Sequence, residues 1–297
     1  MDYDVAIIGS GPAGLTAGIY CARYGLKTII LEKSLVGGTV TLAHSIQNWP
    51  GEKDITGPEL MKKFEEHAKE SGAEIKSAQV SEIKDGDQKE IVLGSESIKA
   101  KAIIISVGAK SRWLKVKGEK EYLNKGVHFC ATCDGPMYSG KNVVVIGEDH
   151  RAVEEAHYLS TVTNKVTIIT SKKELSADKA KQDMLTNVDV LTETNVVEFR
   201  GEQFLNELVL KDKAGKEFSL EANGAFIYIG TEPNTEIIDV EKDGEGRIIV
   251  DTGMKTNKKG IFAAGDCIKK DLMQISTCVG EGATAAYSAA TFVRENK

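Results

Sequence analysis

The sequence is poor in cysteine, has no long apolar run and carries no excess of positive charge. Its 297 residues include only five cysteines, and only two of these are close together, unlike the dense disulfide framework of a small secreted domain. No apolar run approaches the ~18–20 residues that a membrane-spanning helix requires, and the first residues enter a strand pattern without a basic leader. We therefore expect a cytoplasmic protein without a membrane partner.

The balance of charge excludes a second class of function. The chain has 38 Lys and Arg against 44 Asp and Glu, a net charge of −6, so it offers no electrostatic footprint for nucleic acid. One local exception is the basic segment, residues 110–125, in which Lys and Arg outnumber the two glutamates. A charge run of this kind is usually a solvated connector, and a docking surface for an acidic partner is the alternative.

The motif C-A-T-C-D-G at residues 130–135 is the most informative part of the sequence. Thiols at Cys130 and Cys133 can close a small reversible disulfide, and Asp134 beside them suits dithiol–disulfide exchange. A pair with this spacing can also be half of a zinc site. The sequence has no histidine cluster to complete four ligands, and the other cysteines are isolated: Cys21, Cys267 and Cys278. We therefore expect no metal.

The beginning of the chain has the pattern of a Rossmann βαβ unit. A strand at residues 5–8 leads into a glycine-rich turn at 9–14, a helix runs to residue 24, and a strand at 28–31 ends at Glu32. The glycines allow a tight bend and close approach of the backbone to a pyrophosphate, while the helix N-terminus offers N–H donors. Glu32, about 20 residues beyond the glycines, is placed to bind a ribose diol. These features predict a dinucleotide site.

A second unit in the middle of the chain repeats this plan, with a strand at 142–146, a helix at 152–160 and a strand at 165–170. A strand at 102–107 precedes the basic segment, and the chain returns near 235–242. Two such units imply two domains, which suits the length of the chain. We predict an α/β fold of two Rossmann-like, three-layer domains, the second inserted into the first.

The predicted bounds are 1–112 with 243–297 for the outer domain and 113–242 for the inner domain. From residue 244 onward the sequence predicts a hairpin and a strand, and a final helix at about 282–294. The outer segments would thus form one domain that the inner domain interrupts.

With these motifs in view, the chain resembles the low-molecular-weight thioredoxin reductases from end to end. The motifs that carry the resemblance occur in the family's order: the glycine turn with Glu32, Gly37-Gly38-Thr39, Asn48-Trp49-Pro50-Gly51, Ser106-Val107-Gly108-Ala109, the C-A-T-C-D-G motif, and Ala263-Ala264-Gly265-Asp266 with Gln274. The resemblance implies that the outer domain holds FAD, that the chain forms a homodimer and that its partner is thioredoxin or a thioredoxin-like protein.

The resemblance also assigns roles to individual residues. Cys133 would face the flavin, Cys130 would attack the disulfide of the partner, and Asp134 would move the proton that the exchange requires. The structural alternative for Asp134 is a helix N-cap. The FAD site that the resemblance implies consists of Gly9, Ser10, Gly11, Pro12, Ala13, Gly14, Glu32, Lys33, Gly37, Gly38, Thr39, Asn48, Val80, Ser106, Val107, Gly108, Gly265, Asp266, Gln274 and Ile275.

The second Rossmann turn departs from the family's nicotinamide-binding pattern. Where that pattern reads G-x-G-x-x-A or G-x-G-x-x-G, this chain has G-E-D-H-R-A at 147–152. Asp149 replaces the glycine that lets the backbone approach a pyrophosphate, and Glu148 adds a second carboxylate. Two like charges about 4 Å apart repel by about 1 kcal/mol in water and about 4 kcal/mol at an intermediate dielectric. A pyrophosphate would meet repulsion where it needs donors.

A second departure follows the next strand. NADPH-using relatives place a His-Arg-Arg cluster and a later arginine here to hold the 2′-phosphate, whereas this chain has T-S-K-K-E-L-S at 170–176. Lys172 and Lys173 keep positive charge but not the planar guanidinium forks that grip phosphate. In these departures the chain resembles the ferredoxin-dependent flavin thioredoxin reductases. The basic segment then becomes a candidate docking surface for an acidic ferredoxin.

Two other functions stay open. The first is a NAD(P)H-dependent thioredoxin reductase with an atypical phosphate loop. The second is a flavin-binding redox sensor that cycles its disulfide without turnover, which predicts slow or absent reduction of any thioredoxin. Anaerobic titration with NADPH, NADH and reduced ferredoxin distinguishes the electron donors.

Overall fold

A computed structural model of the protein describes residues 2–43, 46, 48–86 and 88–296. The chain forms two compact units: an outer unit made of Met1–Lys110 and Glu232–Lys297, and an inner unit made of Ser111–Thr231. The chain returns to the outer unit at residue 232, earlier than the predicted bound at 243. The reason is packing, because Ile238 and Val240 are buried in the core of the outer unit.

Within the described residues, the outer unit is built on a seven-stranded sheet in the order β3-β2-β1-β6-β5-β4, with β17 also paired to β6. Its strands are β1 (Asp2–Ile8), β2 (Thr28–Glu32), β3 (Glu74–Ser77), β4 (Glu82–Lys84), β5 (Lys89–Leu93), β6 (Glu96–Ile105) and β17 (Ile261–Ala263). All pairs are parallel except β4–β5 and β5–β6. The carboxyl ends of the parallel strands therefore meet at one edge, where open α/β sheets bind their ligands.

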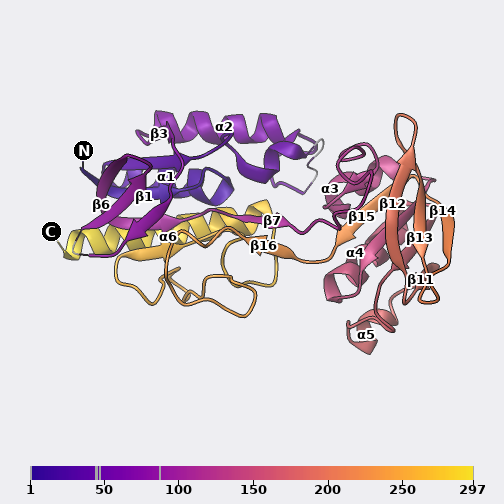
Figure 1. Ribbon diagram of the computed structural model, residues 1–297. Coiled ribbons are helices and arrows are strands. Elements are labelled where there is room, and N and C mark those ends of the chain that lie inside the picture. Colours follow the sequence, from indigo (N-terminus) through magenta and orange to yellow (C-terminus); the bar gives the residue numbers. More distant parts are fainter. Residues whose placement is uncertain (1, 44–45, 47, 87, 297) are drawn as a thin grey trace. The chain divides into compact units, whose positions relative to one another are not determined.

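Helices cover one face of this sheet. They are α1 (Pro12–Arg23), α2 (Gly57–Glu70) and α6 (Ile275–Glu295), with the short helix η1 (Gly38–Leu42) beside α2. Figure 1 shows α6, from the C-terminal part of the chain (yellow), lying beside α1 from the N-terminal part (indigo). The two helices approach closely, since a side chain at Gly282 of α6 would lie 2.3 Å from the backbone oxygen of Ala13 in α1.

The inner unit has the three layers of a Rossmann-like domain. In its residues, all of which the structure describes, a five-stranded parallel sheet runs in the order β11-β10-β9-β15-β8 and a three-stranded antiparallel sheet in the order β12-β13-β14. Val153 and Leu159 of α4 pack on one face of the parallel sheet, and Leu208 and Leu210 of β13 pack on the other. The α/β fold with Rossmann-type sheets is therefore confirmed.

The elements of the inner unit follow in chain order. They are β8 (Val127–His128), α3 (Ala131–Asp134), η2 (Gly135–Tyr138), β9 (Asn142–Gly147), α4 (His150–Val162), β10 (Lys165–Ile169), α5 (Lys179–Gln182), β11 (Val188–Leu191), β12 (Asn195–Gly201), β13 (Leu205–Lys211), β14 (Glu217–Glu221) and β15 (Gly224–Tyr228). The segments that connect the units, β7 (Ala109–Ser111) and β16 (Thr231–Pro233), pair with each other.

Two elements near the C-terminus differ from the prediction. Helix α6 begins at Ile275 rather than near residue 282. Gly280 and Gly282 lower the helix propensity of its first turns, but Gly282 is needed for the close contact with α1. Between residue 244 and β17, the expected hairpin and strand are replaced by turns and isolated bridges. In the described part of the chain, no helix is long and apolar enough to cross a membrane.

Candidate active site

The turn between β1 and α1 contains three glycines, and the fold itself requires two of them. Gly9 has a left-handed φ of +101°, and a side chain there would lie 2.4 Å from the backbone oxygen of Ser106. A side chain at Gly14 would lie 1.9 Å from the backbone oxygen of Gly9. Gly11, in contrast, has an ordinary φ of −70°, and a Cβ there would meet no atom within 4 Å. The open space at Gly11 is a cradle at the N-terminus of α1, where backbone N–H groups favour an anion.

Glu32, at the end of β2, ties the second strand to this turn. Its Oε2 accepts hydrogen bonds from the backbone N and the hydroxyl of Ser10, at 2.9 and 2.7 Å. Its Oε1 accepts one from the backbone N of Ser34, at 2.9 Å. A carboxylate has about four lone-pair sites, so Glu32 retains capacity to accept bonds from a ribose diol.

Other predicted cofactor residues gather at the same edge of the sheet. The backbone N of Gly37 donates to the backbone oxygen of Ser10 at 3.0 Å, and the Ser106 hydroxyl lies 3.0 Å from the backbone oxygen of Gly9. Gly265 follows β17 with a left-handed φ of +85°. The structure thus brings the ends of β1, β2, β6 and β17 together around the cradle.

The remaining predicted residues are placed less uniformly. The Asn48 amide donates to Oε1 of Gln274 at 3.0 Å, and Gln274 precedes the first residue of α6, Ile275. Val80 has its side chain in the hydrophobic core of the outer unit. Five further predicted residues lie after a strand or at the start of η1, and their side chains form no part of the cradle: Lys33, Gly38, Thr39, Val107 and Gly108.

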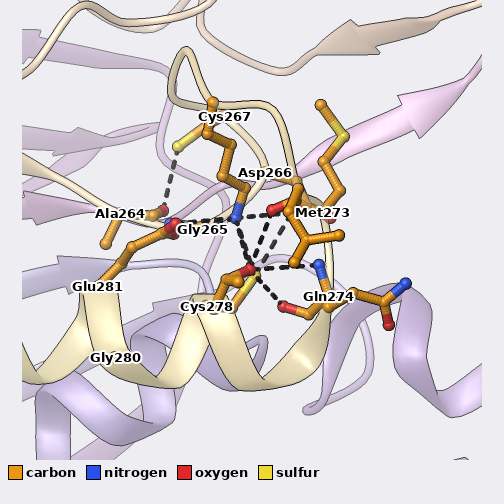
Figure 2. A network of polar contacts seen from close by, with 12 residues as sticks. Ala264, Gly265, Asp266, Cys267, Met273, Gln274, Cys278, Gly280 and Glu281 are labelled. Carbon is orange, nitrogen blue, oxygen red and sulfur yellow. Dashed lines mark hydrogen bonds and ion pairs between the residues drawn. The ribbon is translucent and has the colours of Figure 1, made fainter. Parts of the chain in front are cut away.

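Sequence reasoning missed a partly buried polar network beside Asp266. Figure 2 shows Cys278 and Glu281 of α6 directed toward Asp266. The Lys270 ammonium lies 3.1 Å from Oδ1 of Asp266, 3.0 Å from Oε2 of Glu281 and 3.4 Å from Sγ of Cys278. Glu281 Oε2 also accepts a bond from the backbone N of Gly265 at 2.9 Å. The network therefore holds the Gly265–Asp266 turn in place.

Burial and the neighbouring charges together determine which groups of this network are ionised. Burial raises the pKa of the Cys278 thiol and of the Glu281 carboxyl. Burial alone disfavours the charged form of Lys270, but Cys278, Asp266 and Glu281 around it raise its pKa overall. Lys270 is therefore a cation at neutral pH and the Cys278 thiol stays protonated. The spacing of these residues in the sequence gave no signal of the cluster, because Glu281 reaches it only through the packing of α6.

The inner unit holds the dithiol motif. Cys130 and Cys133 are joined in a disulfide at the start of α3, with Cα atoms 5.3 Å apart. Asp134 stands at the N-cap position of η2, but its side chain makes no capping hydrogen bond. Its Oδ2 instead lies 3.1 Å from Nδ1 of His128. The structure therefore places a buried carboxyl and an imidazole next to the dithiol motif.

The second Rossmann turn is filled by its own side chains. Asp149 is the N-cap of α4, and its Oδ1 accepts a hydrogen bond from the backbone N of Ala152 at 2.9 Å. The Glu148 carboxylate accepts a bond from the Thr170 hydroxyl at 3.1 Å, and its backbone oxygen accepts one from the backbone N of Ser176 at 2.8 Å. Asp149 thus bonds an N–H group that a phosphate at a helix N-terminus would use.

The basic segment is partly neutralised. Lys117 pairs with Glu198 at 2.6 Å and Lys110 with Glu232 at 3.5 Å. Lys115 and Lys120 line a hollow of about 420 Å³, whose other lining residues are Trp113, Val116, Gly118, Glu119 and Glu121. Glu119 is buried because its carboxylate accepts bonds from the backbone N atoms of Leu114 and Lys115. Lys115 and Lys120 are thus the cations of the basic segment that border the hollow, together with the carboxylates of Glu119 and Glu121.

Comparison with known proteins agrees with this geometry. The family model for pyridine nucleotide-disulphide oxidoreductases matches residues 3–282. The chain is 39% identical to a thioredoxin reductase of Bacillus subtilis over 302 residues, which cover 99% of this chain and 95% of that protein. The structure of a thioredoxin reductase from Streptococcus pyogenes is similar, with a TM-score of 0.90, 37% identity and 99% of both chains covered. For a ferredoxin-flavin thioredoxin reductase from Clostridium acetobutylicum the TM-score is 0.56 at 33% identity, with 99% and 98% covered.

A dinucleotide cradle on one Rossmann-type unit and a redox disulfide on another define a flavoprotein disulfide oxidoreductase. The chain belongs to the pyridine nucleotide-disulphide oxidoreductase family and, within it, to the thioredoxin reductases. Its cofactor is FAD. The residues present fit this group, because the open space at Gly11 can admit a pyrophosphate and Glu32 retains acceptor capacity for a ribose.

Proposed function

We propose that the chain passes electrons from reduced ferredoxin, through FAD and the Cys130–Cys133 pair, to thioredoxin or a thioredoxin-like protein. It would act as a homodimer, as expected from its resemblance to the family. The choice of ferredoxin as the electron donor rests on the second Rossmann turn, where the Asp149 carboxylate caps α4.

Three features of this turn disfavour a nicotinamide dinucleotide. Asp149 already bonds the backbone N of Ala152, so a donor that a phosphate needs is taken. The carboxylate also puts negative charge at the positive end of the α4 dipole, which satisfies the helix without a ligand. Glu148 is held next to it by Thr170, so an incoming pyrophosphate would face two carboxylates. Each close like-charge contact costs about 1 to 4 kcal/mol, depending on solvent exposure.

We propose the following roles for the site residues. The cradle at Gly11 and the N-terminus of α1 bind the FAD pyrophosphate, Glu32 binds a ribose, and Asp266, held by Lys270, binds the ribityl and phosphate region. Bound FAD supplies a carrier that takes electrons singly and passes them on as a pair.

The dithiol then carries the pair to the partner. Cys133 faces the flavin and Cys130 attacks the partner's disulfide. Asp134 gives a proton to the Cys130 sulfur when the disulfide opens and takes it back before the attack, because only the thiolate is a nucleophile. Its burial next to the motif supports this role.

Ferredoxin would dock at the hollow lined by Lys115 and Lys120, since ferredoxins are usually acidic and charge complementarity accelerates encounter. A specific observation keeps NAD(P)H as the second candidate donor: Lys172 and Lys173 are exposed after β10, where a 2′-phosphate would lie.

The test is anaerobic flavin reduction followed at 450 nm with each donor. Reduced ferredoxin should bleach the flavin at least about 100-fold faster than NADPH or NADH, a ratio equivalent to about 2.7 kcal/mol. Lys115→Glu with Lys120→Glu should slow reduction by ferredoxin in a salt-sensitive way and leave reduction by dithionite unchanged. Lys172→Glu with Lys173→Glu is the matched control and should have no effect on ferredoxin. Rapid, saturable reduction by micromolar NADPH would establish the second candidate instead.

A further inference from the structure

His128 is a buried titratable residue that the proposed exchange has not used. It lies on β8, the edge strand of the parallel sheet, only two residues before Cys130. Its side chain is 0% exposed and its ring stacks on Phe226 of β15, with centroids 5.4 Å apart at 26°. A fully enclosed imidazole costs free energy unless its ring nitrogens have polar partners. The partners of these nitrogens therefore indicate what the residue does.

One ring nitrogen faces a hydroxyl. Nε2 of His128 lies 2.7 Å from the Tyr138 oxygen, at the end of η2. Burial, with a contribution from the charge of Asp134, raises the pKa of Tyr138 to about 12. Tyr138 therefore keeps its proton at physiological pH, and its oxygen can accept a hydrogen bond from Nε2. The proton of a neutral imidazole is then on Nε2, and Nδ1 can take up the proton that the carboxyl gives.

The other nitrogen faces the carboxyl of the redox motif. Nδ1 lies 3.1 Å from Oδ2 of Asp134, but the approach lacks the alignment of a good hydrogen bond. Asp134 ends the helical turn that begins after Cys130, and its backbone N donates a hydrogen bond to the Cys130 backbone oxygen. A chain of polar groups thus runs from Tyr138 through His128 to the carboxyl beside the dithiol.

We propose that His128 is a positioning residue that shares one exchangeable proton with Asp134 and so supplies the proton of the thiol exchange. The inference rests on the proposed role of Asp134. A buried carboxylate and imidazole that hold one extra proton between them are neutral as a pair, whichever of the two carries it. Because the two groups are enclosed and in contact, the extra proton belongs to the pair rather than to either residue.

The protons and electrons balance over one cycle. When the Cys130–Cys133 bond breaks, two electrons from the reduced flavin go to the sulfurs, Cys133 stays a thiolate, and Cys130 takes the proton of the pair through Asp134. The pair recovers this proton when the Cys130 thiol is deprotonated to attack the partner's disulfide. Cys133 then displaces the partner and restores the original disulfide, while the partner's two thiolates take protons from solvent.

Other ionisable groups surround this pair and enter its pH dependence. The Tyr228 hydroxyl on β15 accepts a bond from the backbone N of Ala131 at 2.6 Å, next to the dithiol. Burial raises the pKa of Glu155 on α4, and Arg151 lies over the Tyr228 ring. Lys141 lies 5.6 Å from the centre of the Tyr138 ring.

The experiment is a single turnover of the holoenzyme. Enzyme reduced with stoichiometric dithionite is mixed anaerobically with oxidised thioredoxin from pH 5.5 to 9, and flavin reoxidation is followed at 450 nm. His128→Asn should lower the pH at which the rate falls to half by at least one unit, because the imidazole that shares the proton with the carboxyl is then absent. At pH 8 this appears as a loss of at least tenfold, and at pH 5.5 as a loss of less than threefold. His157→Asn, at another histidine of the inner unit, is the control and should leave the profile unchanged.

A second measurement detects the proton shared by His128 and Asp134 without turnover. The reduction potential of the Cys130–Cys133 pair is measured at a series of pH values by mass spectrometry in dithiothreitol buffers. The slope of this potential against pH gives the number of protons taken up with the two electrons. The pH at which the slope changes should fall by at least one unit in His128→Asn. Tyr138→Phe, which keeps the ring but loses the hydroxyl, should move it in the same direction, since the imidazole is no longer fixed with Nδ1 toward the carboxyl.

The outcomes separate this inference from the function on which it rests. If Asp134→Asn slows the turnover while His128→Asn and Tyr138→Phe leave both profiles in place, the sharing of the proton is refuted and the role of Asp134 stands. If Asp134→Asn also turns over at the wild-type rate, the proposed role of Asp134 fails, and the inference fails with it. Equal loss of rate at every pH in His128→Asn would show a packing role only and would likewise overturn the inference.

Discussion

Two glycines of the same turn should respond to substitution in opposite ways. A side chain at Gly14 collides with the protein itself, because its Cβ would lie 1.9 Å from the backbone oxygen of Gly9. A side chain at Gly11 meets no protein atom within 4 Å, and its φ of −70° suits any residue. We therefore expect Gly14→Ala to destabilise the outer unit with or without cofactor. Gly11→Asp should leave the apoprotein folded and weaken only the binding of FAD.

The size of the effect at Gly11 follows from electrostatics. A carboxylate about 4 Å from a pyrophosphate charge repels it by about 1 kcal/mol in water and about 4 kcal/mol at an intermediate dielectric. These energies correspond to a loss of FAD affinity of roughly fivefold to 1,000-fold, since about 1.4 kcal/mol is a factor of ten. Gly11→Ala, which adds a methyl group without charge, measures the steric part of this loss alone.

The assay combines the flavin-to-protein absorbance ratio of the purified variants with calorimetric FAD titration and thermal unfolding of each apoprotein. The apoprotein of Gly11→Asp should unfold within a few degrees of the wild type, whereas that of Gly14→Ala should unfold clearly earlier. Full flavin content and wild-type affinity in Gly11→Asp would refute the assignment of the cradle. An apoprotein of Gly11→Asp as unstable as that of Gly14→Ala would refute the inference that the space at Gly11 is open.

Two further predictions concern the disulfide and the partly buried polar network. Cys130→Ser and Cys133→Ser should each abolish reduction of thioredoxin and retain FAD. Only Cys130→Ser should show a long-wavelength charge-transfer band, because it keeps the thiolate that faces the flavin. A band in Cys133→Ser alone would exchange the roles of the two cysteines. Lys270→Met should lower the free energy of unfolding by about 2–3 kcal/mol at pH 8, below the range for fully buried pairs, since it leaves the partly buried Glu281 and Asp266 carboxylates without their cation. The loss should be smaller at pH 5, where Glu281, whose pKa burial already raises, can take a proton. Lys269→Met, at an exposed neighbour, is the control; equal destabilisation by both variants would refute the explanation.

The sequence predicted those parts of the site that depend on local pattern. Gly9 follows β1 and Glu32 ends β2, and the carboxyl ends of these two parallel strands meet at one edge of the outer sheet. The altered turn at Asp149 comes after β9 of the inner unit in the same local pattern. The start of α6 was predicted too late, because Gly280 and Gly282 resemble a helix boundary when their contact with α1 is unknown.

The polar networks could not be predicted in the same way, because they depend on tertiary packing. Lys270 meets Glu281 only because α6 packs beside the turn after β17. His128 meets Tyr138 because β8 and η2 place their side chains on the same face of the sheet, against Phe226. A histidine two residues before a cysteine is not by itself a motif that predicts a function. Burial and the partners of both ring nitrogens are needed to recognise it.

The aspartate at the start of α4 bonds a backbone N–H group of the second turn that a ligand would otherwise use. The Asp149 carboxylate is a competitor for the helix N-terminus that is tethered to it, and tethering by short segments gives effective concentrations on the order of millimolar or above. A free dinucleotide at micromolar concentration must displace this competitor before it can bind. Dilution, washing or a change in the nucleotide pool does not remove it, because it is part of the chain. An attempt to engineer a nicotinamide site into this unit must therefore begin by deleting the Asp149 carboxylate, before any phosphate-binding arginine is added.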